Sequence, residues 1–132
     1  MNLKVILGLL IYFFLGCNQE VEILTEEKIV SIYENGNQKD TQVYHVYNYH
    51  KVLIKKIKYF ESGAVNLEQK VNEDGEANGI TTQFYENGIM QVSGNYYDGR
   101  KDGIFYWYDE DGKPTQIQDF NNGVMNFDSS QM

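Results

Sequence analysis

Proline and cysteine are nearly missing from this sequence of 132 residues, with one of each. Collagen-like and proline-rich chains need many prolines, and a disulfide scaffold needs paired cysteines, so these classes are excluded. Basic residues are also few: 11 stand against 19 acidic ones, and the formal net charge is −8. Such a chain is not expected to bind nucleic acid, whose phosphates it would repel. Aromatic residues make up 14%, too many for a disordered chain, and the length favours one domain.

The first seventeen residues read as a targeting signal. Lys4 precedes an apolar run, Val5 to Leu15, which is shorter than the roughly twenty residues that span a bilayer. A basic start, an apolar run and a small residue are typical of a secretory signal peptide. The sequence FLGC at 14–17 resembles a bacterial lipobox, in which the sulfur of the cysteine, here Cys17, receives a lipid and the chain is cut before it.

These features predict a lipoprotein signal peptide over residues 1–16, lipidation of Cys17 and a tether over residues 17–27. The domain would be anchored to the membrane rather than embedded in it, since two acyl chains hold a protein there durably. We expect it in the bacterial cell envelope, facing the periplasm or the exterior. The alternatives are an uncleaved anchor helix and a signal peptide with an incidental cysteine.

Glycine recurs on a grid with a period of about 24 residues. All nine of these glycines follow Asn, Ser or Asp, where a backbone takes positive φ to reverse direction, so each predicts a turn. Gly94 is the one glycine after Cys17 that lies off the grid. The glycines on the grid are Gly36, Gly63, Gly75, Gly79, Gly88, Gly99, Gly103, Gly112 and Gly123.

Between these turns the sequence has the pattern of strands. Residues 89–97 alternate between apolar and polar side chains, and residues 104–108 are β-branched or aromatic throughout. A lone hairpin is marginally stable in water, so such units must stack. We predict an all-β fold, an antiparallel sheet of stacked β-hairpin repeats over residues 28–127, with a flexible tail at 128–132. The first repeat is irregular, because its second turn, near 47–51, has no glycine.

This grid resembles the MORN-repeat variant of many bacterial exported proteins, including lipoproteins of the YwqK antitoxin family. In that pattern an aromatic residue, two polar residues and Gly are followed by a second Gly, a G-x-x-x-G step and an aromatic strand. Residues 88–112 follow the pattern closely, within a region of resemblance over 59–123. The resemblance implies a curved or twisted sheet of hairpins. It also implies a role in binding proteins and, as for some members, in neutralising a toxin.

Residues suited to catalysis or metal binding are few. With Cys17 lipidated, no thiol is free. His45 and His50, five residues apart on one strand, would point to opposite faces, which disfavours a shared metal. The acidic turns at 73–76 and 109–112 lack the spacing of a calcium loop and are typical of solvated turns. We therefore expect no enzymatic activity, no cofactor and no metal.

The most suggestive candidate for a binding surface is aromatic. Residues 104–108 carry large side chains on both faces of the predicted strand, and a single open sheet cannot bury both. Exposed Tyr and Trp are frequent anchors of interfaces, so we select Tyr97, Phe105 and Trp107 as candidate binding residues. The alternative is that these rings form the core that holds neighbouring repeats together.

The predicted function is that of a non-enzymatic protein-binding module, anchored to a membrane through the lipid on Cys17 and of the antitoxin or immunity kind. The negative charge favours a basic protein partner, with binding that weakens at high salt. Two alternatives remain open at this point. One is a structural scaffold of the envelope, and the other is a carbohydrate-binding surface that stacks sugars on Tyr and Trp.

Overall fold

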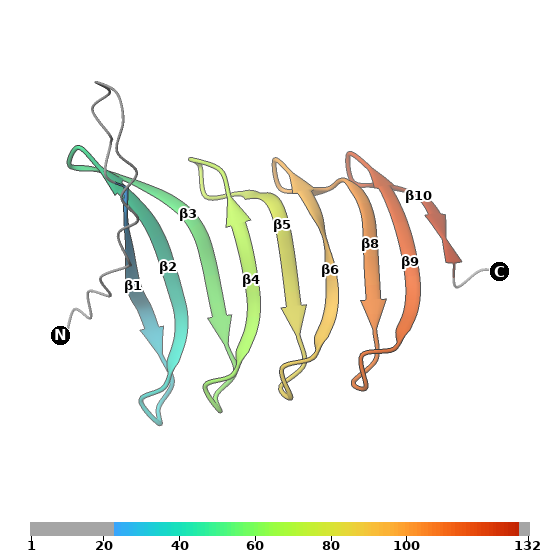
Figure 1. The fold of residues 1–132 in the computed structure, drawn as a ribbon, viewed down its shortest axis with the longest axis horizontal. Helices are drawn as coiled ribbons and strands as arrows, with labels where there is room; N and C mark the ends of the chain where they lie inside the picture. Colours follow the sequence, from blue (N-terminus) through green and yellow to red (C-terminus); the bar gives the residue numbers. More distant parts are fainter. Residues whose placement is uncertain (1–22, 130–132) are drawn as a thin grey trace, which may run out of the picture.

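The computed structural model describes residues 23–129, which form one antiparallel sheet in a single layer (Figure 1). The strands follow one another in hairpin order from edge to edge, except that the short β7 lies off this path and pairs with β6. The predicted sheet of stacked hairpins is thus confirmed. The strands are β1 (Leu24–Ile32), β2 (Gln38–Tyr47), β3 (His50–Tyr59), β4 (Val65–Val71), β5 (Ala77–Phe84), β6 (Met90–Tyr97), β7 (Arg100–Lys101), β8 (Gly103–Tyr108), β9 (Pro114–Asn121) and β10 (Val124–Asp128).

Both ends of the chain lie outside the described residues. These ends include the predicted signal peptide at 1–16, the lipidation site Cys17 and the last residues of the predicted tail. Within the described range, β1 begins at Leu24, so the end of the predicted tether at 17–27 is strand. No helix in residues 23–129 is long and apolar enough to cross a membrane.

The second half of the sheet repeats itself after 24 residues. Residues 79–84 of β5 pair with β6, and residues 103–108 of β8 pair with β9, in two ladders that are identical apart from this shift. Gly79 pairs with Tyr96, for example, and Gly103 pairs with Phe120. The register shift at the end of each ladder also recurs, between Gln83 and Phe84 and again between Trp107 and Tyr108. The period read from the glycines is therefore the period of the backbone.

The turns lie along the two rims of the sheet, and their geometry explains the glycines (Figure 1). All nine glycines of the grid have positive φ, between 76° and 100°. Asp98-Gly99 and Asn122-Gly123 form two-residue turns with positive φ at both positions, which suits the twist of the flanking strands. The irregular first repeat uses Asn48 and Tyr49 in the same conformation, at φ 44° and 66°. A fully exposed tyrosine there takes the place of the glycine.

Neighbouring turns on one rim hold each other through repeated hydrogen bonds. The hydroxyl of Tyr33 donates to the carbonyl of Tyr59 at 2.8 Å, and the hydroxyl of Tyr85 donates to the carbonyl of Tyr108 at 2.9 Å. The asparagine two positions after each of these donors also donates to the backbone of the next turn. The Tyr-x-Asn-Gly sequence therefore both bends its own hairpin and joins it to the next one.

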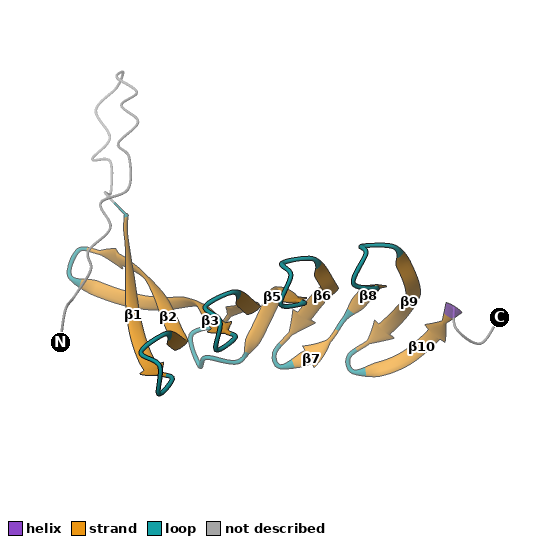
Figure 2. Cartoon of the chain, turned by 90° about the horizontal axis from the view of Figure 1, so that it is seen from below, coloured by secondary structure: helices purple, strands orange, loops and turns teal. Residues whose placement is uncertain are grey.

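The buried side chains form two groups rather than one core. Among the described residues, the buried apolar side chains are Val43, Ile57 and Phe105, which are 5%, 7% and 2% exposed. Thr41 and Thr81 are the buried polar ones, at 1% and 8%. A sheet in one layer offers no second layer to pack against, so burial depends on neighbours in the same face. Figure 2 shows the sheet twisting along its length, which brings such neighbours together.

The register places these two groups on opposite faces. Paired residues share a face, and successive residues of a strand alternate between faces. One row of paired residues, which runs from Thr41 through Ile57 to Tyr106, defines the face that we call the Ile57 face. Phe105 precedes Tyr106 in β8 and therefore lies on the opposite face, which we call the Phe105 face. Val43 shares the Ile57 face, and Thr81, which pairs with Gly94, shares the Phe105 face. The defining row is Thr41, Ile57, Glu68, Thr82, Ser93 and Tyr106.

Candidate binding surfaces

The three aromatic residues selected from the sequence do not form one surface. Phe105 is 2% exposed and belongs to a buried cluster, and Trp107, two positions further along β8, is half-buried on the same face. Tyr97 is 62% exposed. Its neighbour Tyr96 contacts Phe105, and successive residues of a strand alternate between faces, so Tyr97 lies on the Ile57 face. Phe105 therefore has the core role that the sequence left as the alternative.

The Phe105 cluster depends on Gly94. The Phe105 ring meets Tyr96 and Phe120 edge to face, with centroids 5.5 and 5.3 Å apart, a favoured arrangement of aromatic pairs. Gly94 lies under this ring: a Cβ placed on it would come within 2.4 Å of the ring carbons. The absence of a side chain at this position is what lets the ring lie against the sheet.

Lys101 crosses this aromatic cluster from β7. Its Nζ lies 4.6 Å from the ring centroid of Phe120, 4.9 Å from that of Phe105 and 5.4 Å from that of Trp107. Ammonium groups are attracted to ring faces in this way. Burial lowers the pKa of the Lys101 ammonium below its ordinary value. Within residues 23–129, no ion pair joins this group to a carboxylate.

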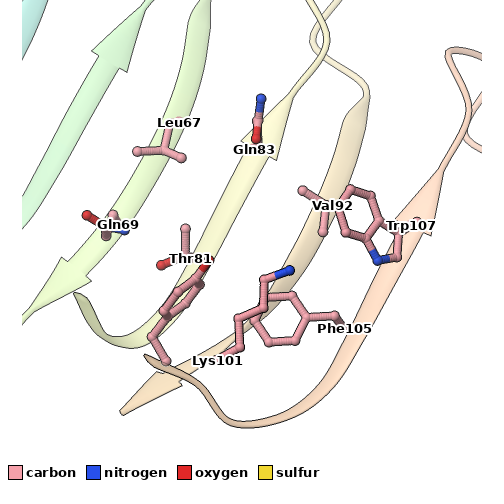
Figure 3. A pocket seen from close by; sticks show the side chains of 9 residues that line it. Leu67, Gln69, Thr81, Gln83, Val92, Lys101, Phe105 and Trp107 are labelled. Carbon is pink, nitrogen blue, oxygen red and sulfur yellow. The ribbon is translucent and has the colours of Figure 1, made fainter. Parts of the chain in front are cut away.

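An open hollow of about 240 Å³ lies beside this lysine on the Phe105 face (Figure 3). Figure 3 shows the Lys101 side chain reaching into the space between Thr81 and Trp107. The Thr81 hydroxyl is buried and has no hydrogen-bond partner among the described residues. The hollow thus combines apolar walls with an unpaired cation, and the unpaired hydroxyl is buried in its wall. Its lining residues are Leu67, Gln69, Thr81, Gln83, Val92, Tyr96, Lys101, Phe105 and Trp107.

The Ile57 face of the second half carries large exposed side chains instead. Tyr106 pairs with Ile117 and follows Ile104 by two positions, so these three share one face across β8 and β9. We call the whole group the apolar stripe: Ile80, Tyr97, Ile104, Tyr106 and Ile117, which are between 40% and 62% exposed. A group of this kind on one face is typical of an interaction site.

Acidic residues lie at the turns on both rims, on either side of the two faces. Glu34, Glu61 and Glu86 occupy equivalent positions in successive turns of one rim, and Asp98 lies in a turn of the other. Part of the net charge is therefore held at the rims. The apolar stripe runs between these two acidic borders.

The two histidines lie differently from the prediction. His45 pairs with Val52, and His50 pairs with Tyr47, because the turn between β2 and β3 separates them. They therefore face the same side of the sheet, and the predicted opposite orientation, which assumed one continuous strand, is wrong. In residues 23–129 no group of three or more His, Cys, Asp or Glu side chains could hold a metal ion.

The geometry defines a hairpin-repeat protein, with successive hairpins joined edge to edge in one sheet. Two segments, residues 77–97 and 101–122, match the family model of the MORN repeat variant. They cover β5 and β6 and then most of β7 to β9, the part whose ladder recurs after 24 residues. The two matched segments thus follow each other in register within the sheet. No curated protein and no solved structure matches the chain.

Sequence reasoning selected Phe105 and Trp107, which line the hollow, but missed Gly94, Lys101 and Thr81. Gly94 carried a signal, because it lies off the grid of turn glycines and inside an alternating strand, where glycine often marks a close approach. Lys101 carried none, since a lysine next to a turn reads as a solvated charge. Thr81 likewise resembles any strand threonine until its neighbours are known.

Proposed function

We propose that this chain is an exported, lipid-anchored, non-enzymatic module that binds a basic protein, in the manner of an antitoxin or immunity protein. The observation that carries the proposal is the apolar stripe between two acidic rims. Interfaces commonly have an apolar centre and a polar border. A partner with an apolar patch flanked by Lys and Arg would complement both parts.

The stripe supports this function better than the Phe105 cluster does. Tyr106 and Tyr97 are exposed aromatic residues on strands held by backbone hydrogen bonds, so little conformational entropy is lost when they are covered. Phe105 is already buried between two neighbouring repeats, against Tyr96 and Phe120. The net charge of −8 would raise the rate at which a basic protein arrives, and salt would reduce that rate.

The lipid anchor is the second part of the proposal. It is supported by the FLGC sequence at 14–17 and by the short apolar run that precedes it. Anchored through Cys17, the sheet would stand close to the membrane surface and meet partners there. Replacing Cys17 with Ser should release the protein from the membrane fraction. A Cys17→Ser protein that stays with membranes would contradict the anchor but leave the binding surface standing.

The binding surface is tested with a photo-reactive amino acid placed in the full chain in living cells. At Tyr106, in the apolar stripe, it should cross-link to a single basic protein. At Val30, which is also exposed but lies on the edge strand β1, it should not. Tyr106→Ser should weaken the captured complex by about 2 kcal/mol, or roughly thirtyfold, as expected for an aromatic anchor.

Two results would contradict the proposal. One is a complex that Tyr106→Ser leaves unchanged. The other is a complex whose affinity is the same in low and high salt, since the acidic rims would then contribute nothing.

A further inference from the structure

The Phe105 face, which the proposed function does not use, contains a cation without a counter-ion. The Lys101 Nζ lies over the rings of Phe120, Phe105 and Trp107, and no ion pair joins it to a carboxylate within residues 23–129. Its pKa is lowered by burial, so the charged ammonium has lost part of its hydration. An anion that reached this group would replace the missing hydration with a charge-assisted hydrogen bond.

We propose that the hollow on the Phe105 face binds the carboxylate of a small organic acid, with Lys101 as the cation and Trp107 as the wall for the body of the acid. The ligand must be small, because about 240 Å³ is below the roughly 300–1,000 Å³ of pockets for drug-sized ligands. It must also be anionic. A cationic ligand would be repelled by the Lys101 ammonium, which already lies over the nearest ring faces, whereas an anion would pair with it.

A second polar group in the hollow supports the same chemistry. Thr81 is 8% exposed, and its hydroxyl, which is buried in the wall of the hollow, finds no partner among the described residues. A buried hydroxyl without a hydrogen bond is costly, so such groups commonly serve a ligand or a water molecule. Gln69 and Gln83 line the same space and bring amide donors to it. A carboxylate offers four lone pairs, enough for the ammonium and an amide together, and a small shift of the Thr81 side chain would add its hydroxyl.

The overall negative charge does not oppose this site strongly. Acidic residues such as Glu86 and Asp98 lie in turns at the rims, whereas the hollow lies over the strands β4 to β8. The Asp128 carboxylate accepts a hydrogen bond from Gln118, whose oxygen in turn accepts from the Trp107 indole. At physiological ionic strength, charges more than about 8 Å apart in solvent are largely screened. The ammonium inside the hollow therefore dominates the last step of binding.

Trp107 provides a built-in reporter, since it is the only tryptophan of the chain and lines the hollow. The full-length protein in detergent is titrated with phenylacetate and with glucuronate, and its tryptophan fluorescence is followed. Phenylacetamide and glucose serve as neutral counterparts of nearly the same shape. We expect the acids to change the fluorescence saturably, with at least roughly tenfold higher affinity than their neutral counterparts.

The two acids distinguish the source of the carboxylate. A stronger response to phenylacetate assigns the site to aryl or aliphatic acids, and a stronger response to glucuronate assigns it to sugar acids. Either result supports the proposal. Equal responses to an acid and to its neutral counterpart overturn it, and so does the absence of any saturable response.

Two variants test the assigned residues. Lys101→Met keeps the aliphatic stem and should lose the acid response, whereas Arg100→Gln, which removes the adjacent cation on the opposite face, should retain it. Thr81→Val should reduce the affinity several-fold. A response that survives Lys101→Met overturns the proposal. The comparison of acids with their neutral counterparts uses the wild-type protein, so it tests the proposal even if a variant fails to fold. It is also independent of the apolar stripe, which lies on the Ile57 face.

Discussion

The two halves of this sheet bury side chains on opposite faces. In the first, β1 to β4, the strands reach ten residues, one turn reverses without glycine, and the buried residues Thr41, Val43 and Ile57 lie on the Ile57 face. In the second, from β5 onward, the ladder recurs after 24 residues and Phe105 is buried on the opposite face. Only the second half matches the repeat family.

This difference shows that a sheet in one layer has no predetermined inner side. Where a glycine such as Gly94 leaves space in the row, aromatic rings collect on that face and bury one another. Where the strands carry β-branched residues, as around Ile57, the side chains of the Ile57 face are buried instead. This sheet thus keeps its hairpin order along its length while the face that buries side chains changes.

The largest expected effect breaks the second half alone. In Gly94→Ala the new Cβ would collide with the Phe105 ring, which must leave its place, and the free energy of unfolding should fall by about 2–3 kcal/mol. Because repeats contact only their neighbours, hydrogen exchange should speed up in β5 to β9 and stay slow in β2 and β3.

Asn95→Ala is the matched control, since this residue is exposed and adjacent in β6. It should change the stability by less than about 0.5 kcal/mol. Equal acceleration of exchange in both halves after Gly94→Ala would contradict the division into two cores.

A smaller effect, opposite in sign between the halves, is expected at the two buried threonines. The Thr41 hydroxyl donates to Gln38 at 3.2 Å, whereas that of Thr81 has no partner among residues 23–129. Thr81→Val should therefore raise the free energy of unfolding by about 1 kcal/mol, and Thr41→Val should lower it by about the same amount. Urea denaturation measures both changes, which can be compared when the m-values of the variants equal that of the wild type. Destabilisation by Thr81→Val would mean that its hydroxyl is satisfied after all.

The smallest effect concerns the irregular turn of the first half. Tyr49 has positive φ and a fully exposed side chain, so it strains the backbone without packing in return. Tyr49→Gly should raise the thermal unfolding midpoint, with a gain of about 1 kcal/mol at most, because Asn-Gly suits this turn. Gly99→Ala, at the equivalent place in the second half, should cost about 1 kcal/mol. If both changes moved stability in the same direction, the two turns would not be equivalent.

Much of the fold could be predicted from single residues, but less of the site. The glycines marked the turns because few other residues adopt positive φ, and alternation indicated which residues share a face. The faces of Phe105 and Tyr106 could not be ranked, since both residues are aromatic. His45 and His50 were placed wrongly because their five-residue spacing was counted along one strand, although the turn predicted near 47–51 separates them.

The sequence by itself determined a sheet of hairpins with a 24-residue period, because turn geometry and alternation act over a few neighbouring residues. Only the tertiary structure decided that the burial changes face between the halves, that Lys101 lies over three rings, and that Thr81 faces a hollow. These outcomes depend on twist and on side chains from strands far apart in sequence, which meet only when the whole sheet is formed.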